Sequence, residues 1–479
     1  MAAFPLNHAH LLVNRLLALN PGPAFHWVVL HGERVSCRND TDVERTFRQE
    51  SNFAYLSGCE VPGAAYTLGY EHEGGAFNAA KLQTKLHLPE VDPAEVMWCG
   101  FPPSADELSK SLTFSEITTG WTSVSLYPPK PQNEGLRTFI HTLPWTRAPT
   151  AVVSSINGPT STTQYLIKAL HEARRNKTEY ELTLMRKASA ITGEAHTALM
   201  AAVGYGSVTD ENAAEAVFTS VCRKRGSKHQ AYTPIMASGT SAGTLHYVAN
   251  DRPFPTTAPG SLLLVDAGAE FQNYAADVTR CIPIGNDGRF TKECREIYEL
   301  VLLMQEEGFK MIRPGADWEA IQRKMHDVLA RGLLKLGIFV AGDVKGSEDE
   351  VVAAIIKSGA TTAFYPHGVG HLLGLDVHDV GGLPEGKSTD PLLRYLRLRV
   401  PLEVGFVVTC EPGAYFNRHL LAPYKNSPFI DHAKVEEYFY VGGVRIEDNL
   451  LVTVDGYENL TPATLPKTVE QIEKLTARR

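Results

Sequence analysis

Four acidic residues stand inside strongly apolar segments of the C-terminal half, and they constrain the fold more than any other feature. Asp266 ends SLLLV, Asp277 precedes VTRCIPI, Glu411 follows GFVVTC, and Glu447 lies within VRIEDNLLV. Carboxylates are almost never fully buried unless they pair with a cation or bind a metal. Each one alone has an ordinary explanation, because a strand-end Asp is usually a turn residue and a strand Glu usually faces water. Four of them in one region predict strands that converge on a shared site.

The spacing of these residues adds detail to that prediction. Asp266 and Asp277 are separated by AGAEFQNYAA, which is able to form a hairpin and place both carboxylates on adjacent strands. The alternative is a pair of aspartates beside an exposed turn, but the apolar flanks disfavour it. Arg445 and Glu447 share one face of a strand. The arginine would therefore orient a carboxylate, bind a substrate anion, or form a simple ion pair.

A cluster of histidines lies between these acidic segments. The run FYPHGVGHLLGLDVHD contains His367, His371 and His378, and its glycines let the backbone approach closely where side chains converge. A lone histidine would more often be a hydrogen-bonded core residue. The run is not H-E-x-x-H, which excludes a zincin. One imidazole with four carboxylates suits Mn, Fe, Co or Zn in a two-metal site, which can hold a bridging hydroxide and polarise a carbonyl.

Composition excludes several other classes of protein. The seven cysteines are widely spaced without C-x-x-C, so a disulfide framework and a zinc ribbon are not expected. The net charge of −8 disfavours nucleic acid as a partner. No apolar run approaches the roughly 18–20 residues of a membrane span, so no membrane partner is expected. The N-terminus lacks the pattern of a secretory signal, which makes the cytoplasm the expected compartment and a mitochondrial leader the weaker alternative.

The pattern of elements predicts two domains of α/β (α+β) class. Residues 1–155 contain the strand-like runs WVVLHG and AAYTLGY and the first part of AVVSSING (151–158), after an opening amphipathic helix. Residues 156–178 form a linker and the start of a helix, and residues 179–479 alternate helices and strands. The four acidic segments are all strands of this second domain.

The motifs VDAGAE…ADVTR, HGVGH…HD, TCEPGAYF and VRIEDN closely resemble the signature of the metal-dependent proline-specific peptidases, the prolidases and Xaa-Pro aminopeptidases. FRQESNFAYLSG in the first domain is also similar to the matching stretch of eukaryotic prolidases. The resemblance covers the whole chain. It implies a creatinase-like N-terminal mixed-sheet domain, a C-terminal pita-bread metallopeptidase domain and a homodimer.

The same resemblance implies a role for each matched residue. It implies two divalent metal ions, Mn²⁺ or alternatively Co²⁺ or Zn²⁺, with the ligands Asp266, Asp277, His371, Glu411 and Glu447. Glu411 would also be the base, and His246 and His378 would stabilise the tetrahedral intermediate. The implied substrate-binding residues are His246, His367, His378, Arg397, Arg445 and Tyr232. For Arg397 the alternative is a solvated basic face with its neighbours Arg394 and Arg399.

The predicted function is hydrolysis of Xaa-Pro dipeptides, the prolidase reaction, because Arg397 would bind the terminal carboxylate of a dipeptide. The alternative is an Xaa-Pro aminopeptidase that acts on longer proline-containing peptides. Two remoter hypotheses are a pita-bread protein without catalysis that serves as a binding module, and a serine hydrolase. The last rests on Ser241 in GTSAG, which fits G-x-S-x-G, although the following TLHYVANDRP does not predict the helix that this motif needs.

Overall fold

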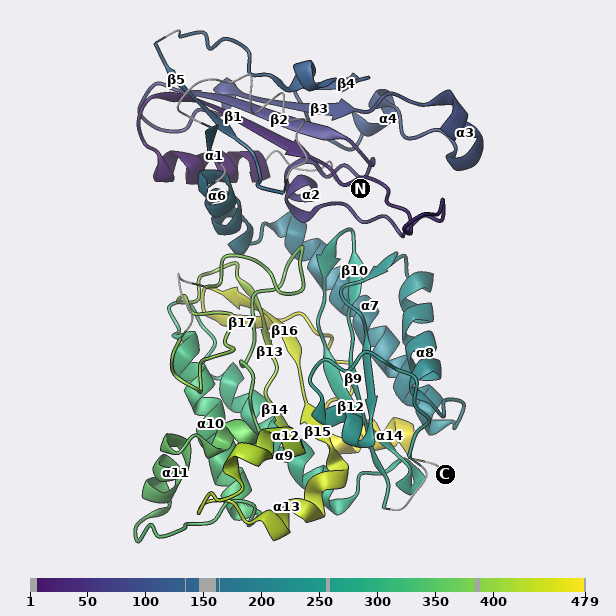
Figure 1. The fold of residues 1–479 in the computed structure, drawn as a ribbon, viewed down its shortest axis with the longest axis vertical. Coiled ribbons are helices and arrows are strands. Elements are labelled where there is room, and N and C mark those ends of the chain that lie inside the picture. The colour runs from purple at the N-terminus through teal and green to yellow at the C-terminus, as the bar shows by residue number, and fades with distance from the viewer. Residues whose placement is uncertain are drawn as a thin grey trace. The chain divides into compact units, whose positions relative to one another are not determined.

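The chain folds into two compact units, Met1–Arg174 and Arg175–Arg479. The computed structural model describes residues 7–133, 135–145, 161–162, 164–255, 259–383 and 388–477. Both units combine helices with strands, as Figure 1 shows. The predicted strand AVVSSING lies outside the described residues.

A mixed six-stranded sheet in the order β4-β3-β2-β1-β5-β6 forms the centre of the first unit. Its antiparallel core is β1–β2–β3, and β4, β5 and β6 join in parallel. The strands are β1 (Ala24–His31), β2 (Ala65–His72), β3 (Leu82–Leu88), β4 (Glu116–Thr119), β5 (Arg137–His141) and β6 (Ser161–Thr162). β1 and β2 are almost fully buried, which fits their runs of apolar residues.

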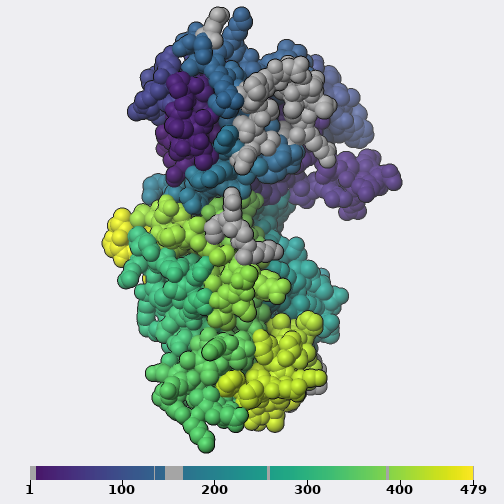
Figure 2. All heavy atoms as spheres, turned by 60° about the vertical axis from the view of Figure 1, so that its left-hand side comes forward, coloured from purple at the N-terminus to yellow at the C-terminus, as the bar shows by residue number. Residues whose placement is uncertain are grey.

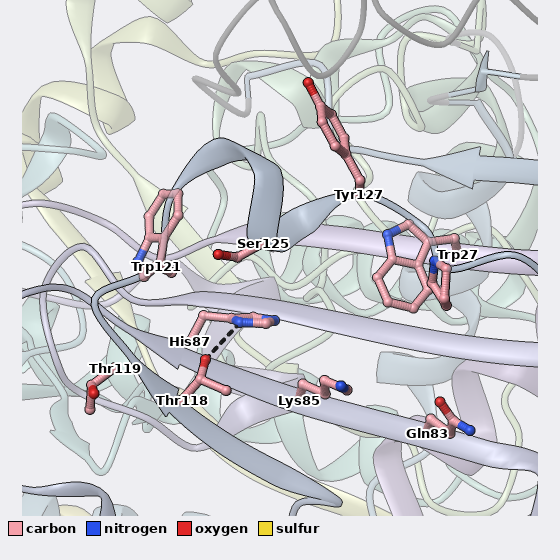
Figure 3. A pocket seen from close by; sticks show the side chains of 10 residues that line it. Trp27, Gln83, Lys85, His87, Thr118, Thr119, Trp121, Ser125 and Tyr127 are labelled. Atoms are coloured by element: carbon pink, nitrogen blue, oxygen red, sulfur yellow. Dashed lines mark hydrogen bonds between the residues drawn. The ribbon is translucent and has the colours of Figure 1, made fainter.

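The opening segment forms α1 (Asn7–Leu19), as its leucine spacing predicts, and buries Leu12 and Leu16. The other helices of the unit are α2 (Ser51–Ser57), α3 (Pro93–Cys99), α4 (Ala105–Leu108) and α6 (Gln164–Arg175), with the 3₁₀ turns η1 (Ala79–Lys81) and η2 (Ser123–Leu126). A cavity of about 340 Å³ lies against this sheet. Figure 3 shows His87 in this cavity with Trp27 and Trp121 to either side. Nδ1 of His87 forms a hydrogen bond of 2.9 Å with the hydroxyl of Thr118.

Four small sheets form the second unit, in the orders β11-β10-β7, β12-β9-β8, β13-β16-β17 and β14-β15. Their strands are β7 (His229–Gln230), β8 (Ile235–Ser238), β9 (Ser261–Asp266), β10 (Ala269–Phe271), β11 (Tyr274–Ala275), β12 (Thr279–Ile284), β13 (Val407–Cys410), β14 (Gly413–Tyr415), β15 (Gly443–Arg445), β16 (Asp448–Thr453) and β17 (Gly456–Asn459). The strands predicted around the four acidic residues are therefore confirmed.

Helices pack against these sheets from different sides. α7 and α8 contact the strands β8 and β10–β12, whereas α9 contacts β13–β15 and α10 packs on α9 (Figure 1). The helices are α7 (Glu179–Gly204), α8 (Glu211–Lys224), α9 (Lys292–Phe309), α10 (Trp318–Lys335), α11 (Glu348–Lys357), α12 (Arg418–Leu421), α13 (His432–Tyr438) and α14 (Val469–Thr476), with the 3₁₀ turns η3 (Gly239–Gly243), η4 (Asn286–Gly288), η5 (Ala360–Ala363), η6 (Ala422–Tyr424) and η7 (Phe439–Val441). Together they bury one large apolar core.

Two segments of this unit that are distant in the sequence also pair with each other. The Val340 amide donates to the Phe429 carbonyl at 2.9 Å, and Phe339 and Ile430 form an isolated bridge. In Figure 2 the green surface that follows α10 accordingly lies beside the yellow-green surface of α12 and α13.

Candidate metal centre

The sheet β12-β9-β8 brings the first two carboxylates together. β9 and β12 pair antiparallel with Asp266 opposite Thr279, and Asp277 stands two residues before Thr279 on the same face. The hydroxyl of Tyr232 contacts one carboxylate oxygen of Asp266 and one of Asp277. A phenol has one proton, so it donates to these two oxygens in turn. The two aspartates therefore share one hydroxyl as a neighbour.

The histidine segment lies along β13. The Thr409 amide donates to the carbonyl of His371 at 2.9 Å, and the Glu411 amide donates to that of Val369 at 2.8 Å. This close antiparallel approach requires Gly370, since a Cβ there would lie 2.1 Å from the carbonyl oxygen of Thr409. As a result, Nε2 of His371 stands 3.3 Å from Oε1 of Glu411.

Glu447 completes the group from the next strand. β13 and β16 pair with Cys410 opposite Asp448, so Glu411 and Glu447 face each other one position further along. Ligand atoms of Asp277, His371 and Glu447 all lie within 4.8 Å of one another, and all three residues are buried. Thr279 Oγ1 donates to Oε2 of Glu447 at 2.7 Å. The other oxygen, Oε1, is buried with no hydrogen-bond partner among the described residues.

Burial and mutual repulsion raise the pKa values of three of these carboxylates. Burial, followed by repulsion from Asp277 and Glu411, holds the pKa of Glu447 well above its ordinary range. Burial also raises the pKa of Glu411 to about 7 and that of Asp277 above its ordinary value. Asp266 is the exception: burial would raise its pKa, but the adjacent Arg445 guanidinium holds it below the ordinary value. The cluster therefore retains protons that a divalent cation would displace.

The imidazole of His371 directs its Nε2 atom toward these carboxylates. Its Nδ1 lies 3.0 Å from the carbonyl oxygen of Leu372, which accepts a hydrogen bond, so the proton of a neutral ring resides on Nδ1. Nε2 lies 3.5 Å from Asp277 and 3.3 Å from Glu411. Burial would lower the pKa of His371, but the hydrogen bond to Asp277 and the charge of Glu411 raise it above its ordinary value, so a metal at Nε2 would displace a proton there. A backbone carbonyl that fixes the tautomer is the usual support of a metal-binding histidine.

Arg445 is held on the protein rather than turned toward solvent. Its guanidinium donates to Asp266, and also to the hydroxyl of Tyr415 at 2.9 Å. That hydroxyl lies 2.7 Å from Nε2 of His367, whose Nδ1 donates to the carbonyl of Gly368 at 2.9 Å. Burial, then Arg445, lowers the pKa of His367 to about 3, so this imidazole is neutral and accepts from the tyrosine. Of the alternatives for Arg445, the geometry favours the one in which it orients a carboxylate.

A cavity of about 720 Å³ opens onto the cluster, and the candidate metal ligands and substrate-binding residues all line it. His246, His378 and Arg397 do so with exposed side chains. Burial and neighbouring cations lower the pKa of His246, and burial lowers that of His378 to about 3. Arg397 stands apart from its two neighbours: Arg399 pairs with Glu319 at 2.8 Å, and Arg394 lies over the ring of Tyr395.

Three residues near the cluster were not singled out by the sequence. Tyr415 joins Arg445 to His367, and Thr279 donates to Glu447. Asn449 holds Asp277 by its backbone, since its side chain accepts from the Asp277 amide at 3.0 Å and donates to the Asp277 carbonyl. Each lies within two or four residues of a predicted ligand or arginine, so strand alternation along the same motifs was the available signal.

Ser241 does not have the surroundings of a catalytic serine. β8 is followed by the 3₁₀ turn η3 rather than by an α-helix. The Ser241 hydroxyl is buried and accepts a hydrogen bond from Arg252 at 3.2 Å. A guanidinium stays protonated and has no lone pair to act as a base. The geometry thus disfavours the serine-hydrolase hypothesis.

Family models match both parts of the chain. Residues 183–454 match the metallopeptidase family M24, and residues 9–122 match the N-terminal domain of aminopeptidase P. The chain belongs to metallopeptidase family M24. The predicted resemblance to proline-specific metallopeptidases and the predicted fold class are confirmed.

Relatives with names narrow the comparison further. A protein named probable Xaa-Pro aminopeptidase PEPP from Paracoccidioides brasiliensis strain Pb03 is 38% identical and covers 98% of this chain and 96% of its own length. A protein of the same name from Coccidioides posadasii strain C735 is 39% identical over 94% of this chain and 92% of its own length. The chain is thus similar over nearly its whole length to proteins named as Xaa-Pro aminopeptidases.

Solved structures agree with these relatives. Aminopeptidase PepP of Pseudomonas aeruginosa superimposes with a TM-score of 0.76 at 29% identity, covering 100% of this chain and 99% of that one. Zinc-substituted aminopeptidase P of Escherichia coli, in complex with product, gives a TM-score of 0.76 at 26% identity with 100% of both chains covered. The comparisons therefore favour the aminopeptidase alternative over the predicted prolidase.

Proposed function

We propose that this metallopeptidase is an Xaa-Pro aminopeptidase that uses two divalent metal ions and acts on peptides longer than dipeptides. The observation that carries the proposal is the buried convergence of Asp277, His371 and Glu447, in which one glutamate oxygen has no partner among the described residues. A buried, unpaired carboxylate is costly unless a cation accompanies it. The names of the relatives, which call them aminopeptidases, support this proposal over a dipeptidase.

The donor set suits hard divalent cations. Asp266, Asp277, His371, Glu411 and Glu447 would hold the metals, and all five residues line the same cavity. Four carboxylates and one imidazole favour Mn²⁺, with Co²⁺ or Zn²⁺ as alternatives. When bound, the metals would polarise the scissile carbonyl and lower the pKa of the attacking water.

The protein side chains would then move protons and stabilise charge. Glu411 would accept the proton of the attacking water. His246 and His378 would each donate one N–H to the oxygen on which negative charge develops, because lowered pKa values keep both imidazoles neutral. The bond from Arg445 would keep Asp266 ionised and in place as a ligand.

Arg397 would bind the C-terminal carboxylate of a short peptide without restricting the enzyme to dipeptides. We expect Arg397→Ala to lower kcat/KM about tenfold for the free acid Ala-Pro-Ala and to leave its C-terminal amide nearly unchanged, since a hydrogen bond to a charged group contributes roughly 1.5–3 kcal/mol. Steady-state kinetics on the acid, the amide and Ala-Pro provide the test. Arg394→Ala is the matched control, because that arginine does not line the cavity. Wild-type enzyme that cleaves only Ala-Pro would restore the prolidase hypothesis.

Metal binding is expected to weaken as the pH falls below about 7. The folded, metal-free protein holds the pKa of Glu411 at about 7 and raises those of Glu447 and Asp277, so protons compete with the metal below these values. The apparent Kd for Mn²⁺ should rise about tenfold for each pH unit for every proton displaced. Titration calorimetry in buffers of different ionisation enthalpy measures the apparent Kd and the number of protons released on binding. A Kd that is constant between pH 5 and pH 8 would contradict this electrostatic description.

Homodimer formation and the cellular compartment stay predictions. In the part of the chain that the structure describes, no helix is long and apolar enough to cross a membrane.

A further inference from the structure

A buried ion pair includes the residue that directly follows one of the cavity histidines. Nζ of Lys177 donates to Oδ2 of Asp379 at 3.0 Å, and both side chains are only 1% exposed. Asp379 immediately follows His378, which is exposed and lines the cavity. A charge pair with so little access to water is worth its desolvation only when both partners are held in a fixed geometry.

Both partners are anchored by their backbones. The Lys177 amide donates to the carbonyl of Gly405 at 2.8 Å, just before β13 begins, and the Asp379 amide donates to that of Leu372 at 2.9 Å. Gly374 lets the intervening chain close over the pair, since a Cβ there would lie 2.2 Å from Oδ2 of Asp379 and 3.0 Å from Cε of Lys177. The loop 372–379 is therefore closed around the ion pair.

His378 itself has little else to fix it. Its ring lies edge-on to that of His371, with centroids 4.5 Å apart and planes at 82°. Among the described residues no hydrogen bond holds its imidazole, which leaves both ring nitrogens available to a ligand. The orientation of the exposed ring thus depends on the backbone that the next residue, Asp379, anchors from inside.

We propose that Lys177 and Asp379 are positioning residues that hold His378 toward the substrate carbonyl. The proposal rests on the proposed function, in which His378 stabilises the developing oxyanion. The competing explanation is that the pair only stabilises the fold. The two explanations predict different results in a protein without the His378 imidazole. If the pair positions His378, removing the pair should then have no further effect on activity.

The test uses Lys177→Met combined with Asp379→Leu, which removes both charges and leaves neither one buried alone. We expect kcat/KM for Ala-Pro-Ala to fall about 100-fold, mainly in kcat, because a displacement near 1 Å has that effect on a reacting geometry. Metal content should be unchanged. In a His378→Ala background the same two substitutions should cause no further loss. Lys310→Met is the matched control, since its pair with Glu307 is at the surface, with the lysine side chain 67% exposed.

Two results would overturn the proposal. One is a double variant with wild-type kcat/KM. The other is a triple variant whose loss of kcat/KM equals the product of the losses in the double variant and in His378→Ala. A crystal structure of the zinc-loaded double variant gives a readout that needs no activity. The His378 ring should be displaced or disordered, and a ring that superimposes on that of the wild type would refute positioning. Failure of the proposed function has a different signature, because the wild-type enzyme would then not cleave Ala-Pro-Ala.

Discussion

Glu447→Gln is expected to abolish metal binding at one site and to lower kcat/KM on Ala-Pro-Ala about 10⁴-fold. The substitution removes the negative charge of a residue whose Oε1 has no partner among the described residues and whose Oε2 is held by Thr279. The loss of a metal takes with it several kcal/mol of transition-state stabilisation. Elemental analysis after dialysis against Mn²⁺ measures the metal, and steady-state kinetics measure the activity.

The same variant has an opposite effect on the metal-free protein. The pKa of Glu447 in the fold is raised above its ordinary value of 4.5, so the native state holds a proton that the unfolded chain releases. This contribution to stability is present below pH 4.5 and is lost as the pH rises toward the raised value. Glutamine stays neutral, so metal-free Glu447→Gln should melt above the metal-free wild type at pH 8. Metal should then raise the Tm of the wild type much more than that of the variant.

Glu458→Gln is the control, because that residue forms a surface ion pair with Arg186 at 2.7 Å and is 41% exposed. It should retain metal and activity. A Glu447→Gln enzyme with two bound metals and wild-type kcat/KM would show that this carboxylate is not a ligand.

Glu411→Gln is expected to reduce kcat by about 10³-fold while the protein stays folded and still binds peptide. General-base catalysis contributes typically 10²–10⁴-fold, and this residue would also be a metal ligand. The amide that replaces the carboxylate has no basic oxygen to accept the proton of the attacking water. Single-turnover kinetics, with calorimetric binding of the product Pro-Ala, separate the chemical step from binding.

The pH profile provides a second readout for this residue. Burial raises the pKa of Glu411 to about 7 in the metal-free protein, and two nearby cations would lower it. In the wild type, kcat should therefore fall with decreasing pH only below pH 7. The remaining kcat of Glu411→Gln should not change over the same pH range. Glu403→Gln, an exposed residue that precedes β13, should match the wild type. An acidic limb that persists unchanged in Glu411→Gln would assign the base to another group.

The strands around the site could be predicted because local signals agree there. Each is a short apolar run bounded by Gly, Pro or Asn, and the polar residues within it are anomalous enough to mark a shared site. Residues 166–203 are rich in Ala, Leu, Glu, Lys and Arg, and this composition predicts a helical stretch but no break within it. Thr178 caps α7 through a reciprocal box with Glu181, so the stretch becomes two helices rather than one.

Contacts that depend on strand register could not be predicted in the same way. Tyr415 reaches Arg445 across 30 residues of sequence, and Asn449 reaches Asp277 across 172. Lys177 and Asp379 are separated by 202 residues, and each alone is an ordinary charged residue in the sequence. Only the fold brings such pairs together, because their distance is set by how sheets and loops pack.

Substrate length was the other limit of the sequence. Arg397 predicts recognition of a carboxylate, but an exposed arginine at a cavity does not specify how far that carboxylate lies from the scissile bond. The name of the relatives, probable Xaa-Pro aminopeptidase, favours the aminopeptidase alternative over the dipeptidase. The same arginine is therefore compatible with a tripeptide whose third residue carries the carboxylate.

Release of alanine from Ala-Pro-Ala by Mn²⁺-reconstituted protein tests the central claim most directly. We expect free alanine and Pro-Ala in equal amounts and no cleavage of Ala-Ala-Ala. The activity should be lost with a chelator and restored by Mn²⁺. Mass spectrometry of the products identifies the bond that is cut. Metal-loaded, folded protein that leaves Ala-Pro-Ala intact, or that cuts Ala-Ala-Ala equally well, would contradict it.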